Sequence, residues 1–575
     1  MLCLFIAVLV VICATIFLNP HFMKKIFTWF FAVSSTFLFA QAEPFGYTVE
    51  TSVLENLPVN ELATFDHEAL WAEDTELEKR GGRTNIGRLV DLHLNATTAG
   101  TWTSFNNGDR LWQYRFRSAN ALGVCMYFED LYIPQGAVMF LYSMDRKTFV
   151  GPFTQEDCNA HGRFMMGEVL GDEAILEYYE PAGVVSTPRI GMQSVGHMYR
   201  YLYDYSMYAD QDRGSESCEV DVNCPEGSDW VNQRDAVVRL LIVDGGAQGL
   251  CSGTIMNNEL KDCRRLLLTA MHCGEGVSDA EWLQCSVRFR YQRANCGSGS
   301  APSTNSRTGV FHLADSNDGG GSSGSDFLLL EMEDEIPSSF NVYYAGWDAR
   351  TATPADVVCI HHPAGDVKKI STATNIVSST WQAPGHHWQV SWMETETNHG
   401  VTEGGSSGSA IFSVPSGLVV GQLTGGASFC NSPNAPDYFG KMDRNWDDNP
   451  NAANEKLKVF LDPNDTGALS FGGGRPEVDA DMNCFVAAIQ EPTLSFTDIT
   501  VFPTVADEFV RFQSGRFREM EGYQLFNASG AAVGAGVFRE ETETLQTSNL
   551  PAGVYFVTFT QQDGAHLTKK LVVRH

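Results

Sequence analysis

Three short motifs place a histidine, an aspartate and a serine beside apolar runs. His272 follows LLLTAM, Asp326 precedes FLLLEM, and Ser407 lies within GGSSGSAIF. Imidazole, carboxylate and hydroxyl are the base, the orienting group and the nucleophile that acyl transfer requires. The small residues around Ser407 would let the N–H groups of Gly405 and Ser407 point into one hole, as an oxyanion needs. A strand-end histidine, a strand cap and a flexible linker would explain each motif alone, but together they predict a Ser-His-Asp hydrolase.

The composition indicates what kind of protein must position these groups. At roughly 150 residues per domain, 575 residues predict three or four folded units, and 53 glycines with 36 phenylalanines favour a turn-rich, mainly β protein. The formal net charge is -31. Phosphate binding needs clustered cations, so nucleic acid is excluded as the default partner, whereas basic substrates would be attracted.

The N-terminus carries two apolar segments. Residues 1–18 are uncharged and apolar, and a second apolar run lies between the Lys24-Lys25 pair and Ala40-Gln41-Ala42. The second run has the features of a secretory signal cleaved after Ala42, with the true start at Met23. Residues 1–22 are then an over-extended gene start or a membrane anchor, and no other stretch is long enough to span a membrane.

Four further regions follow the N-terminal extension and signal of residues 1–42. Short alternating segments such as LWQYRFRS and EAILEYYE predict an antiparallel β-rich N-terminal block, residues 43–213. The central region, residues 214–475, holds nearly all the candidate chemistry. Residues 476–492 form a linker, and residues 493–575, the C-terminal region, alternate again and predict a small all-β domain.

Cysteine usage fits an exported protein. Cys3 and Cys13 precede the signal, which leaves an even 12 of the 14 cysteines for disulfides. Cys125 and Cys158 are the only cysteines of the N-terminal block and are expected to pair. Paired C-x-x-C units are absent, which disfavours zinc. The adjacent histidines point to opposite faces of a strand and favour core or surface positions over a metal site, so we expect neither metal nor cofactor: His361, His362, His386, His387.

From about Cys218 to Arg475 the sequence resembles the trypsin-like serine peptidases, and among them bacterial lysyl endopeptidase. The resemblance rests on motifs that occur in one order: CSG, TAMHC, SDFLLLE, AGWD, IHHP, VTEGGSSGS, GQLTGG and DYFG. The order His, Asp, Ser is that of chymotrypsin. It implies a chymotrypsin-like double β-barrel between a β-rich propeptide and a small C-terminal β-sandwich, with His272, Asp326 and Ser407 catalytic and Gly405 and Ser407 forming the oxyanion hole.

The same resemblance bears on the substrate. Ordinary trypsins have a pocket aspartate six positions before the nucleophile, where this chain has Val401. Lysyl endopeptidase has its acid after the nucleophile, and Asp437 occupies the matching position, so the resemblance implies that Asp437 binds a substrate ammonium group. Trp381 matches a pocket-wall aromatic residue of that family, and Thr424 stands where its companion is a histidine.

The family's three disulfides imply three bridges in this chain: Cys218 with Cys430, Cys224 with Cys296, and Cys251 with Cys273. The remaining central and linker cysteines have no counterparts and are expected to form two further bridges of open connectivity: Cys263, Cys285, Cys359, Cys484.

Activation must differ from that of many trypsin-like enzymes. Their freed N-terminal ammonium pairs with an aspartate just before the nucleophile, where this chain has Ser406. We therefore expect activation by removal of the N-terminal block, which resembles a propeptide, with a cut after Arg213; a binding domain is the alternative. No lysine lies between Lys147 and Lys261. Either the pocket also accepts arginine or another peptidase makes this cut.

The C-terminal region resembles the sorting domain of type IX secretion. The resemblance rests on Val501-Phe502-Pro503, YQLFNASGAAV, SNLPAGVYFVTF and Thr568–Val573, although Thr504 departs from the usual asparagine. It implies export through the periplasm and outer membrane to the cell surface or the medium, with the type IX machinery as a partner. A carbohydrate-binding or adhesive β-module is the alternative.

These features predict a secreted, monomeric serine endopeptidase that cleaves protein or peptide substrates after lysine, with arginine as a second residue that it could accept. A catalytically silent surface-binding or adhesion protein on a peptidase fold, and a trypsin-like peptidase of different specificity, are the alternatives.

Overall fold

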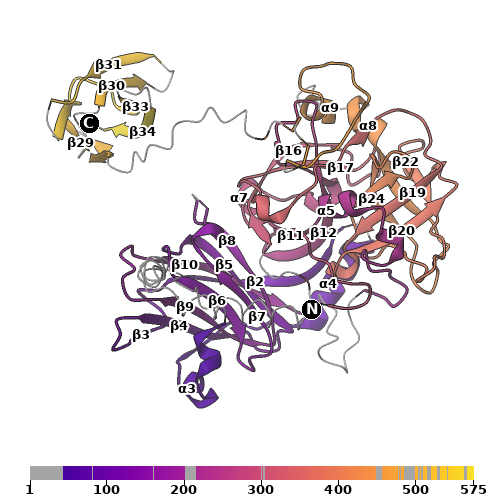
Figure 1. Cartoon of the computed structure of the whole chain (residues 1–575), viewed down its shortest axis with the longest axis horizontal. Coiled ribbons are helices and arrows are strands. Elements are labelled where there is room, and N and C mark those ends of the chain that lie inside the picture. Colours follow the sequence, from indigo (N-terminus) through magenta and orange to yellow (C-terminus); the bar gives the residue numbers. More distant parts are fainter. Residues whose placement is uncertain are drawn as a thin grey trace, which may run out of the picture. The chain divides into compact units, whose positions relative to one another are not determined.

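The computed structural model describes the chain from residue 43 to residue 574 with gaps (Figure 1). The described residues are 43–79, 82–159, 161–200, 215–299, 301, 305–448, 456–476, 478–479, 481–482, 484, 499–502, 505–506, 509–514, 520–527, 531–539, 542–561 and 566–574. The expected signal peptide, the cut after Arg213, Thr504 and most of the linker lie outside them. The chain divides into two compact units, Met1–Asn483 and Cys484–His575. In the described part, no helix is long and apolar enough to cross a membrane.

The N-terminal block is built on a six-stranded sheet of order β1-β4-β9-β6-β7, with β3 paired to β4. Every residue of β6 and six of the eight in β9 are buried, as expected of inner strands. The elements of this sheet and its two helices are α3 (Thr51–Glu55), β1 (Val59–Glu61), α4 (His67–Lys79), β3 (Thr101–Ser104), β4 (Arg110–Arg117), β6 (Val138–Ser143), β7 (Phe149–Phe153) and β9 (Glu173–Glu180).

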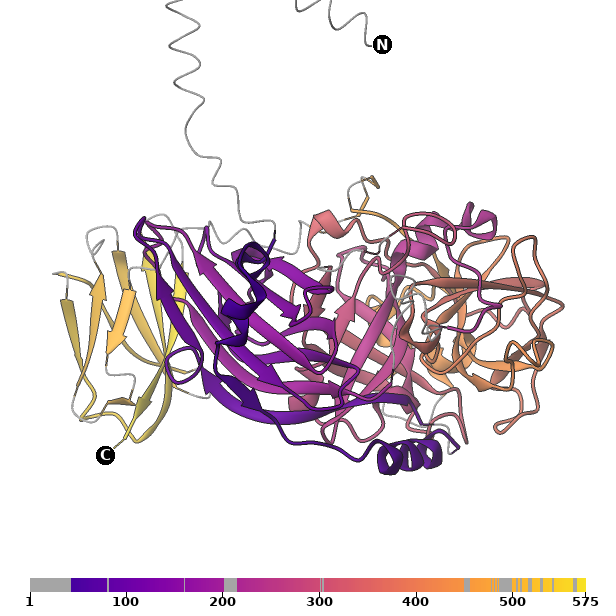
Figure 2. The ribbon, with the colours of Figure 1, turned by 90° about the horizontal axis from the view of Figure 1, so that it is seen from below.

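A second sheet joins the N-terminal block to the central region. Its main path runs β15-β14-β11-β12-β2-β10-β5-β8, so β2 (Thr84–Asn95) connects strands of the block to β12 (Ala247–Met256) (Figure 2). In the antiparallel β2/β12 ladder, Thr84 pairs with Leu250 and Arg88 with Ala247. The other strands are β5 (Gly123–Tyr132), β8 (Phe164–Leu170), β10 (Arg189–Met198), β11 (Val237–Asp244), β13 (Leu266–Ala270), β14 (Ser286–Arg288), β15 (Ser306–Thr308), β16 (Val310–Asp315) and β17 (Phe327–Met332).

This junction has its own apolar core, which combines residues of both regions: Ile86, Cys125, Tyr127, Met165, Met198, Leu241, Val243, Leu250. Buried ionic contacts also cross the junction. Glu168 of the block accepts a 2.5 Å hydrogen bond from Arg239 and a 3.1 Å hydrogen bond from Arg288 of the central region. The block and the central region are therefore packed as one body in this form of the chain.

The second half of the central region is a nine-stranded sheet of order β20-β19-β23-β24-β25-β22-β21, with β18 on β24 and β26 on β18. Short turns and single helical turns connect its strands. Its elements are β18 (Trp347–Asp348), β19 (Asp356–His361), β20 (Lys369–Thr374), β21 (Val377–Ser378), β22 (His387–Val390), β23 (Ala410–Ser413), β24 (Val419–Gly426), β25 (Asp437–Lys441), α8 (Met442–Asp447), α9 (Leu457–Leu461) and β26 (Ser470–Phe471). The first half of the central region contains three short helices, α5 (Val231–Ala236), α6 (Met271–Gly274) and α7 (Asp279–Trp282).

The C-terminal unit has a three-stranded sheet, β27-β29-β32, and a five-stranded sheet, β28-β34-β33-β30-β31, around an aromatic core that includes Phe512, Tyr523 and Phe559. Its strands are β27 (Ile499–Phe502), β28 (Val505–Ala506), β29 (Phe509–Ser514), β30 (Met520–Asn527), β31 (Ala532–Gly536), β32 (Thr542–Gln546), β33 (Gly553–Gln561) and β34 (His566–Val573). The mainly β fold class expected from the sequence is confirmed.

Candidate active site

His272 and Asp326 meet where two neighbouring strands of one sheet end. β13 leads into the helical turn that carries His272, and Asp326 immediately precedes β17, which pairs with β13. His272 Nδ1 lies 2.7 Å from Asp326 Oδ2, and the backbone N–H of His272 donates to Asp326 Oδ1 at 2.9 Å. An ionised Asp326 can only accept hydrogen bonds, so neutral His272 carries its proton on Nδ1. Nε2 is then unprotonated and can act as a base.

Burial alone would lower the pKa of His272, but the Asp326 carboxylate outweighs it and raises the pKa above its ordinary value. Asp326 is held in turn, since its own N–H donates to Asp318 Oδ2 at 2.8 Å. Asp326 has a φ of 61°, in the left-handed region that asparagine and aspartate tolerate best. The loop from Asp318 to Asp326 therefore fixes the carboxylate against the imidazole.

Ser407 lies in the tight turn before β23. Gly405 has a φ of 94°, and a β-carbon there would lie 3.0 Å from the carbonyl oxygen of His362. Ser252 of β12 draws the loop's carbonyls to one side, because its hydroxyl donates to Gly405 O at 2.9 Å and its N–H donates to Ser407 O at 2.8 Å. Among the described hydrogen bonds, none uses the N–H of Gly405 or Ser407. Both are available to an oxyanion.

A cavity of about 450 Å³ connects the base, the serine and the specificity candidates. Its lining includes His272, Ser407, Trp381, Thr424 and Asp437. Asp326 lies behind His272 and does not line it. Within the described residues, no hydrogen bond joins Ser407 to His272, so the structure brings these two side chains to one cavity without linking them.

Asp437 is a buried carboxylate at this cavity, only 1% exposed. Its Oδ2 accepts hydrogen bonds from Trp392 Nε1 at 2.6 Å, Thr402 Oγ1 at 2.7 Å and Ser428 Oγ at 2.6 Å. Oδ1 accepts one bond, from the Ser428 N–H at 3.1 Å. Burial raises the pKa of Asp437, and these donors oppose burial by favouring the ionised form. Oδ1 thus keeps capacity for a cation.

Gly426 leaves that oxygen approachable. A β-carbon at Gly426 would lie 1.9 Å from Asp437 Oδ1, closer than any real contact. The sequence analysis did not single out Gly426, nor the donors Trp392, Thr402 and Ser428. The motifs GQLTGG and VTEGGSSGS contain Gly426 and Thr402, but neither links them to Asp437, because the three donors reach Asp437 from different segments of the chain.

Trp381 and Thr424 line the cavity beside His387, which the sequence analysis expected to be a core or surface residue. Trp381 stacks on Tyr438, with ring centroids 4.5 Å apart, and meets the edge of His387 at 5.3 Å. Within the described part of the chain, neither ring nitrogen of His387 nor Thr424 Oγ1 has a hydrogen-bond partner. Burial lowers the pKa of His387 to about 4, so this ring is neutral.

Residues of the N-terminal block line the same cavity. Glu78 at the end of α4, Gly82 and Thr84 at the start of β2 contribute to it together with His272 and Ser407. A β-carbon at Gly404 would lie 2.2 Å from Thr84 Oγ1, so β2 begins directly against the loop that carries Ser407. The sequence analysis gave no sign of this contact, since the two segments lie more than 300 positions apart.

The structure contains the three bridges Cys218–Cys430, Cys224–Cys296 and Cys251–Cys273. Cys263 and Cys484 are also disulfide-bonded. The expected pair of Cys125 with Cys158 is wrong, because both are free thiols. Cys125 points into the junction core, whereas Cys158 packs against the separate core of the block. The expectation that Cys285 and Cys359 are bridged is also wrong, since both are buried free thiols.

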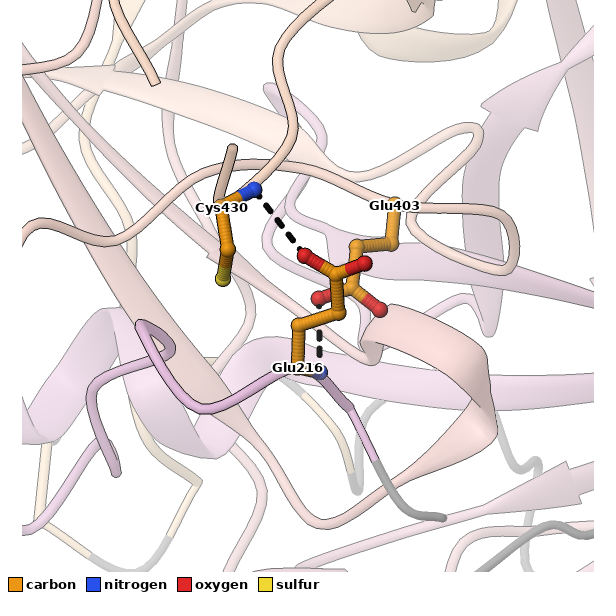
Figure 3. Close-up of side chains that lie close together, drawn as sticks. All are labelled: Glu216, Glu403 and Cys430. Carbon is orange, nitrogen blue, oxygen red and sulfur yellow. Dashed lines mark hydrogen bonds between the residues drawn. The ribbon is translucent and has the colours of Figure 1, made fainter. Parts of the chain in front are cut away.

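One cluster in the described part of the chain has metal-like spacing. Ligand atoms of Glu216, Glu403 and Cys430 lie within 4.8 Å of one another (Figure 3). The sulfur of Cys430 is bonded to Cys218 and offers no thiolate. The carboxylates instead accept backbone N–H groups: Cys430 N donates to Glu216 Oε2 at 3.0 Å, and Glu216 N donates to Glu403 Oε1 at 2.9 Å. The two carboxylates therefore link separate backbone segments by hydrogen bonds.

Comparison with known proteins agrees with the resemblance seen in the sequence. Residues 213–440 match the family model "Lysyl endopeptidase, C-terminal domain", and residues 500–574 match "Secretion system C-terminal sorting domain". A lysyl endopeptidase of Pseudomonas aeruginosa is 31% identical over 298 residues, which cover 49% of this chain and 62% of that protein. The chain thus spans less than two thirds of that relative. The sorting-domain match indicates export by type IX secretion, which confirms the expected secreted or cell-surface location.

The chain also resembles solved protease structures of low sequence identity. A thermostable serine protease, AL20, from an extremophilic microorganism is 11% identical, with a TM-score of 0.28, and the match covers 36% of this chain and 92% of that one. A Glu endopeptidase bound to MPD is 17% identical, with a TM-score of 0.25 and coverage of 37% and 88%.

Proposed function

We propose that this protein is a secreted serine endopeptidase that cleaves protein or peptide substrates on the carboxyl side of lysine. The observation that carries the proposal is the single cavity that holds an imidazole paired with a buried carboxylate, a serine in a tight turn and a second buried carboxylate. The match of residues 213–440 to the lysyl endopeptidase domain supports it independently.

The chemistry follows from the positions of the groups. Ser407 Oγ attacks the scissile carbonyl carbon while His272 Nε2 takes its proton, and Asp326 orients and stabilises the imidazolium. The N–H groups of Gly405 and Ser407 hold the negative oxygen of the tetrahedral intermediate. Its collapse breaks the C–N bond, and the leaving amine takes the proton from His272. A water molecule then repeats the sequence on the acyl-enzyme and restores Ser407.

Lysine specificity is assigned to Asp437, because it lines the cavity and its Oδ1, beside Gly426, accepts only one hydrogen bond and can also accept one from an ammonium group. Trp381 supplies an apolar wall for the methylene groups of a lysine side chain. Arginine remains the second side chain that this pocket could accept.

The N-terminal block is assigned an inhibitory role in the uncut chain. Glu78, Gly82 and Thr84 line the cavity that a substrate would enter, and the β2/β12 ladder holds them there. A cut after Arg213 separates the block covalently, but the packed junction must also open before a protein substrate can bind.

Two measurements test the proposal. A fluorophosphonate probe should label the processed parent protein at Ser407, and Ser407→Ala should lose labelling and about a millionfold in turnover. Mass-spectrometric mapping of cuts in a denatured protein mixture should then find cuts after lysine. Cuts after both lysine and arginine would widen the specificity and allow self-processing at Arg213. An unlabelled parent that cuts nothing would refute peptidase activity and favour a binding protein.

A further inference from the structure

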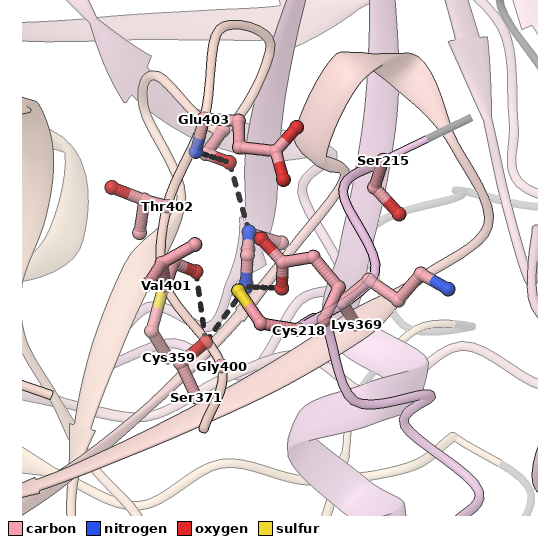
Figure 4. A network of polar contacts seen from close by, with 12 residues as sticks. Ser215, Cys218, Cys359, Lys369, Ser371, Gly400, Val401, Thr402 and Glu403 are labelled. Atoms are coloured by element: carbon pink, nitrogen blue, oxygen red, sulfur yellow. Dashed lines mark hydrogen bonds and ion pairs between the residues drawn. The ribbon is translucent and has the colours of Figure 1, made fainter. Parts of the chain in front are cut away.

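A chain of buried polar contacts lies beneath the loop that carries Ser407 (Figure 4). Ser406 Oγ accepts a hydrogen bond from the N–H of Glu403 at 3.1 Å and lies 2.8 Å from His361 Nδ1. On the other side of the ring, His361 Nε2 lies 3.2 Å from Ser371 Oγ, and Ser371 Oγ donates to the carbonyl of Val401 at 2.9 Å. The contacts begin and end within residues 401–406.

Only one proton arrangement satisfies all of these contacts. Ser371 uses its hydroxyl proton on Val401 O, so its oxygen must accept from His361 Nε2–H. His361 Nδ1 is then an acceptor, and Ser406 O–H donates to it. Burial, aided by the charge of Lys369, lowers the pKa of His361 to about 3, which keeps the ring neutral as this arrangement requires. The hydrogen bonds therefore run in one direction, from Ser406 to His361, from His361 to Ser371 and from Ser371 to Val401 O.

A pair of carboxyl groups lies next to this chain. Glu219 is 1% exposed at its side chain, and its Oε2 lies 3.8 Å from His361 Nε2. Burial raises the pKa of Glu219 well above its ordinary value, and the neighbouring Glu403 carboxylate raises it further. Burial also raises the pKa of Glu403, whose charge acts on Glu219. Both shifts favour the protonated carboxyl group, which would keep an uncompensated charge away from the neutral ring.

The other charged groups here are paired with partners of their own. Lys369 lies 2.6 Å from Asp221 Oδ1 and 3.5 Å from Asp366 Oδ2. Ser215 Oγ donates to Asp366 at 2.7 Å, and Glu216 N donates to Glu403 at 2.9 Å. These contacts leave Glu219 and Glu403 as the acids that face the imidazole-hydroxyl chain.

Ser406 connects this chain to the reacting groups. The N–H of Ser407 belongs to the peptide unit that follows Ser406, and the N–H of Gly405 lies one residue before it. A rotation about the backbone of Ser406 would turn both donors away from a common point. Two side chains anchor this loop among the described hydrogen bonds: the Ser252 hydroxyl holds Gly405 O from β12, and the Ser406 hydroxyl joins the loop to His361 and to the N–H of Glu403.

We propose that His361 and Ser406, supported by Ser371 and the Glu219–Glu403 carboxyl pair, are positioning residues that hold the oxyanion hole in its donating geometry. This inference rests on the proposed peptidase function. Ser406, His361, Ser371 and Glu219 do not line the cavity, whereas Glu403 does. The four residues outside the cavity therefore act on catalysis through the orientation of the Gly405 and Ser407 N–H groups.

The test compares Ser406→Ala with the parent, both processed from the full-length chain. Loss of the hydroxyl should lower kcat about 10- to 100-fold with little change in KM, since an oxyanion donor acts mainly on the transition state. A peptide lysine aldehyde, which forms a hemiacetal oxyanion, should bind more weakly by a similar factor. The product acetyl-lysine, which makes no oxyanion, should bind equally well to both.

Ser409→Ala is the matched control. Ser409 is also buried near the nucleophile, but its hydroxyl contacts Cys359 Sγ at 3.3 Å and takes no part in the chain. Its kcat should stay within about twofold of the parent. Should Ser406→Ala fail to fold, Ser371→Ala removes the far end of the chain and should give a smaller loss in kcat of the same kind.

The outcomes separate the two proposals. An active parent with an equally active Ser406→Ala variant would overturn the positioning role and leave the peptidase function intact. Equal losses for the aldehyde and for acetyl-lysine would also overturn it, because they would indicate general damage to the pocket. A parent that neither cleaves nor reacts with a fluorophosphonate would refute the peptidase function, and the positioning role with it.

Discussion

Replacement of Asp437 by asparagine tests the assigned lysine pocket most directly. The change keeps the size of the side chain and, with the amide oxygen in the place of Oδ2, an acceptor for Trp392 Nε1 and Ser428 Oγ, but it removes the charge from a carboxyl group that is 1% exposed. At an effective dielectric constant of about 20, two unit charges about 4 Å apart attract by about 4 kcal/mol. Tenfold in rate corresponds to about 1.4 kcal/mol, so this attraction is equivalent to about a thousandfold.

The free-energy cost of removing an ammonium group from water reduces the net attraction below this value. We therefore expect a loss of about 100- to 1000-fold in kcat/KM for lysine substrates. The matched assay uses two otherwise identical peptides, one with lysine and one with norleucine, which has the same methylene chain without the ammonium group. The norleucine peptide should be cleaved about equally by both proteins. The preference for lysine over norleucine should therefore collapse in Asp437→Asn.

Fluorophosphonate labelling of Ser407 and the melting temperature serve as controls for folding. An unchanged preference for lysine in a variant that folds and labels normally would refute the assignment of Asp437. A loss that is equal for both peptides would show that the substitution damages the site as a whole, and would equally refute a role confined to charge recognition.

Two further predictions concern the block and the buried acids. Because Glu78, Gly82 and Thr84 line the cavity, the uncut chain should react with a fluorophosphonate about 10- to 100-fold more slowly than the processed protein; equal rates would contradict an inhibitory block. Glu219→Gln should gain stability relative to the parent as the pH rises. The raised pKa of Glu219 means that the folded parent holds a proton that the unfolded chain loses near pH 4.5, so parental stability falls from there towards the folded-state pKa. Melting temperatures at pH 4.5 and at mildly alkaline pH measure this, and a constant difference between the two proteins would contradict it.

The candidate site could be predicted from the sequence wherever a functional residue lies in a short recognisable motif. His272, Ser407 and Asp437 each lie in a distinct local pattern, and the structure places all three at one cavity. The mainly β class was equally accessible, since alternating apolar residues and frequent glycines are properties of local sequence.

Contacts between distant segments could not be predicted where no short motif marks the residues that make them. Cys125 and Cys158 were paired by counting, but the structure directs them into different cores. The pairing of β2 with β12 depends on backbone groups, which any residue supplies. His361 was interpreted as a core or surface residue from its position on a strand. Its place in the proton chain depends on Ser371 and Ser406, which belong to other segments.

The ladder between β2 and β12 also determines what the protein exposes after processing. β12 pairs with β11 along one side, while its other side is shared between β13, at Thr254–Met256, and β2, at Ala247–Leu250. If the block leaves as proposed, the backbone groups of those four residues become an open sheet edge, and such edges pair readily with extended chains. In the uncut protein the block therefore also caps an aggregation-prone edge, and this protection lasts until export and processing are complete.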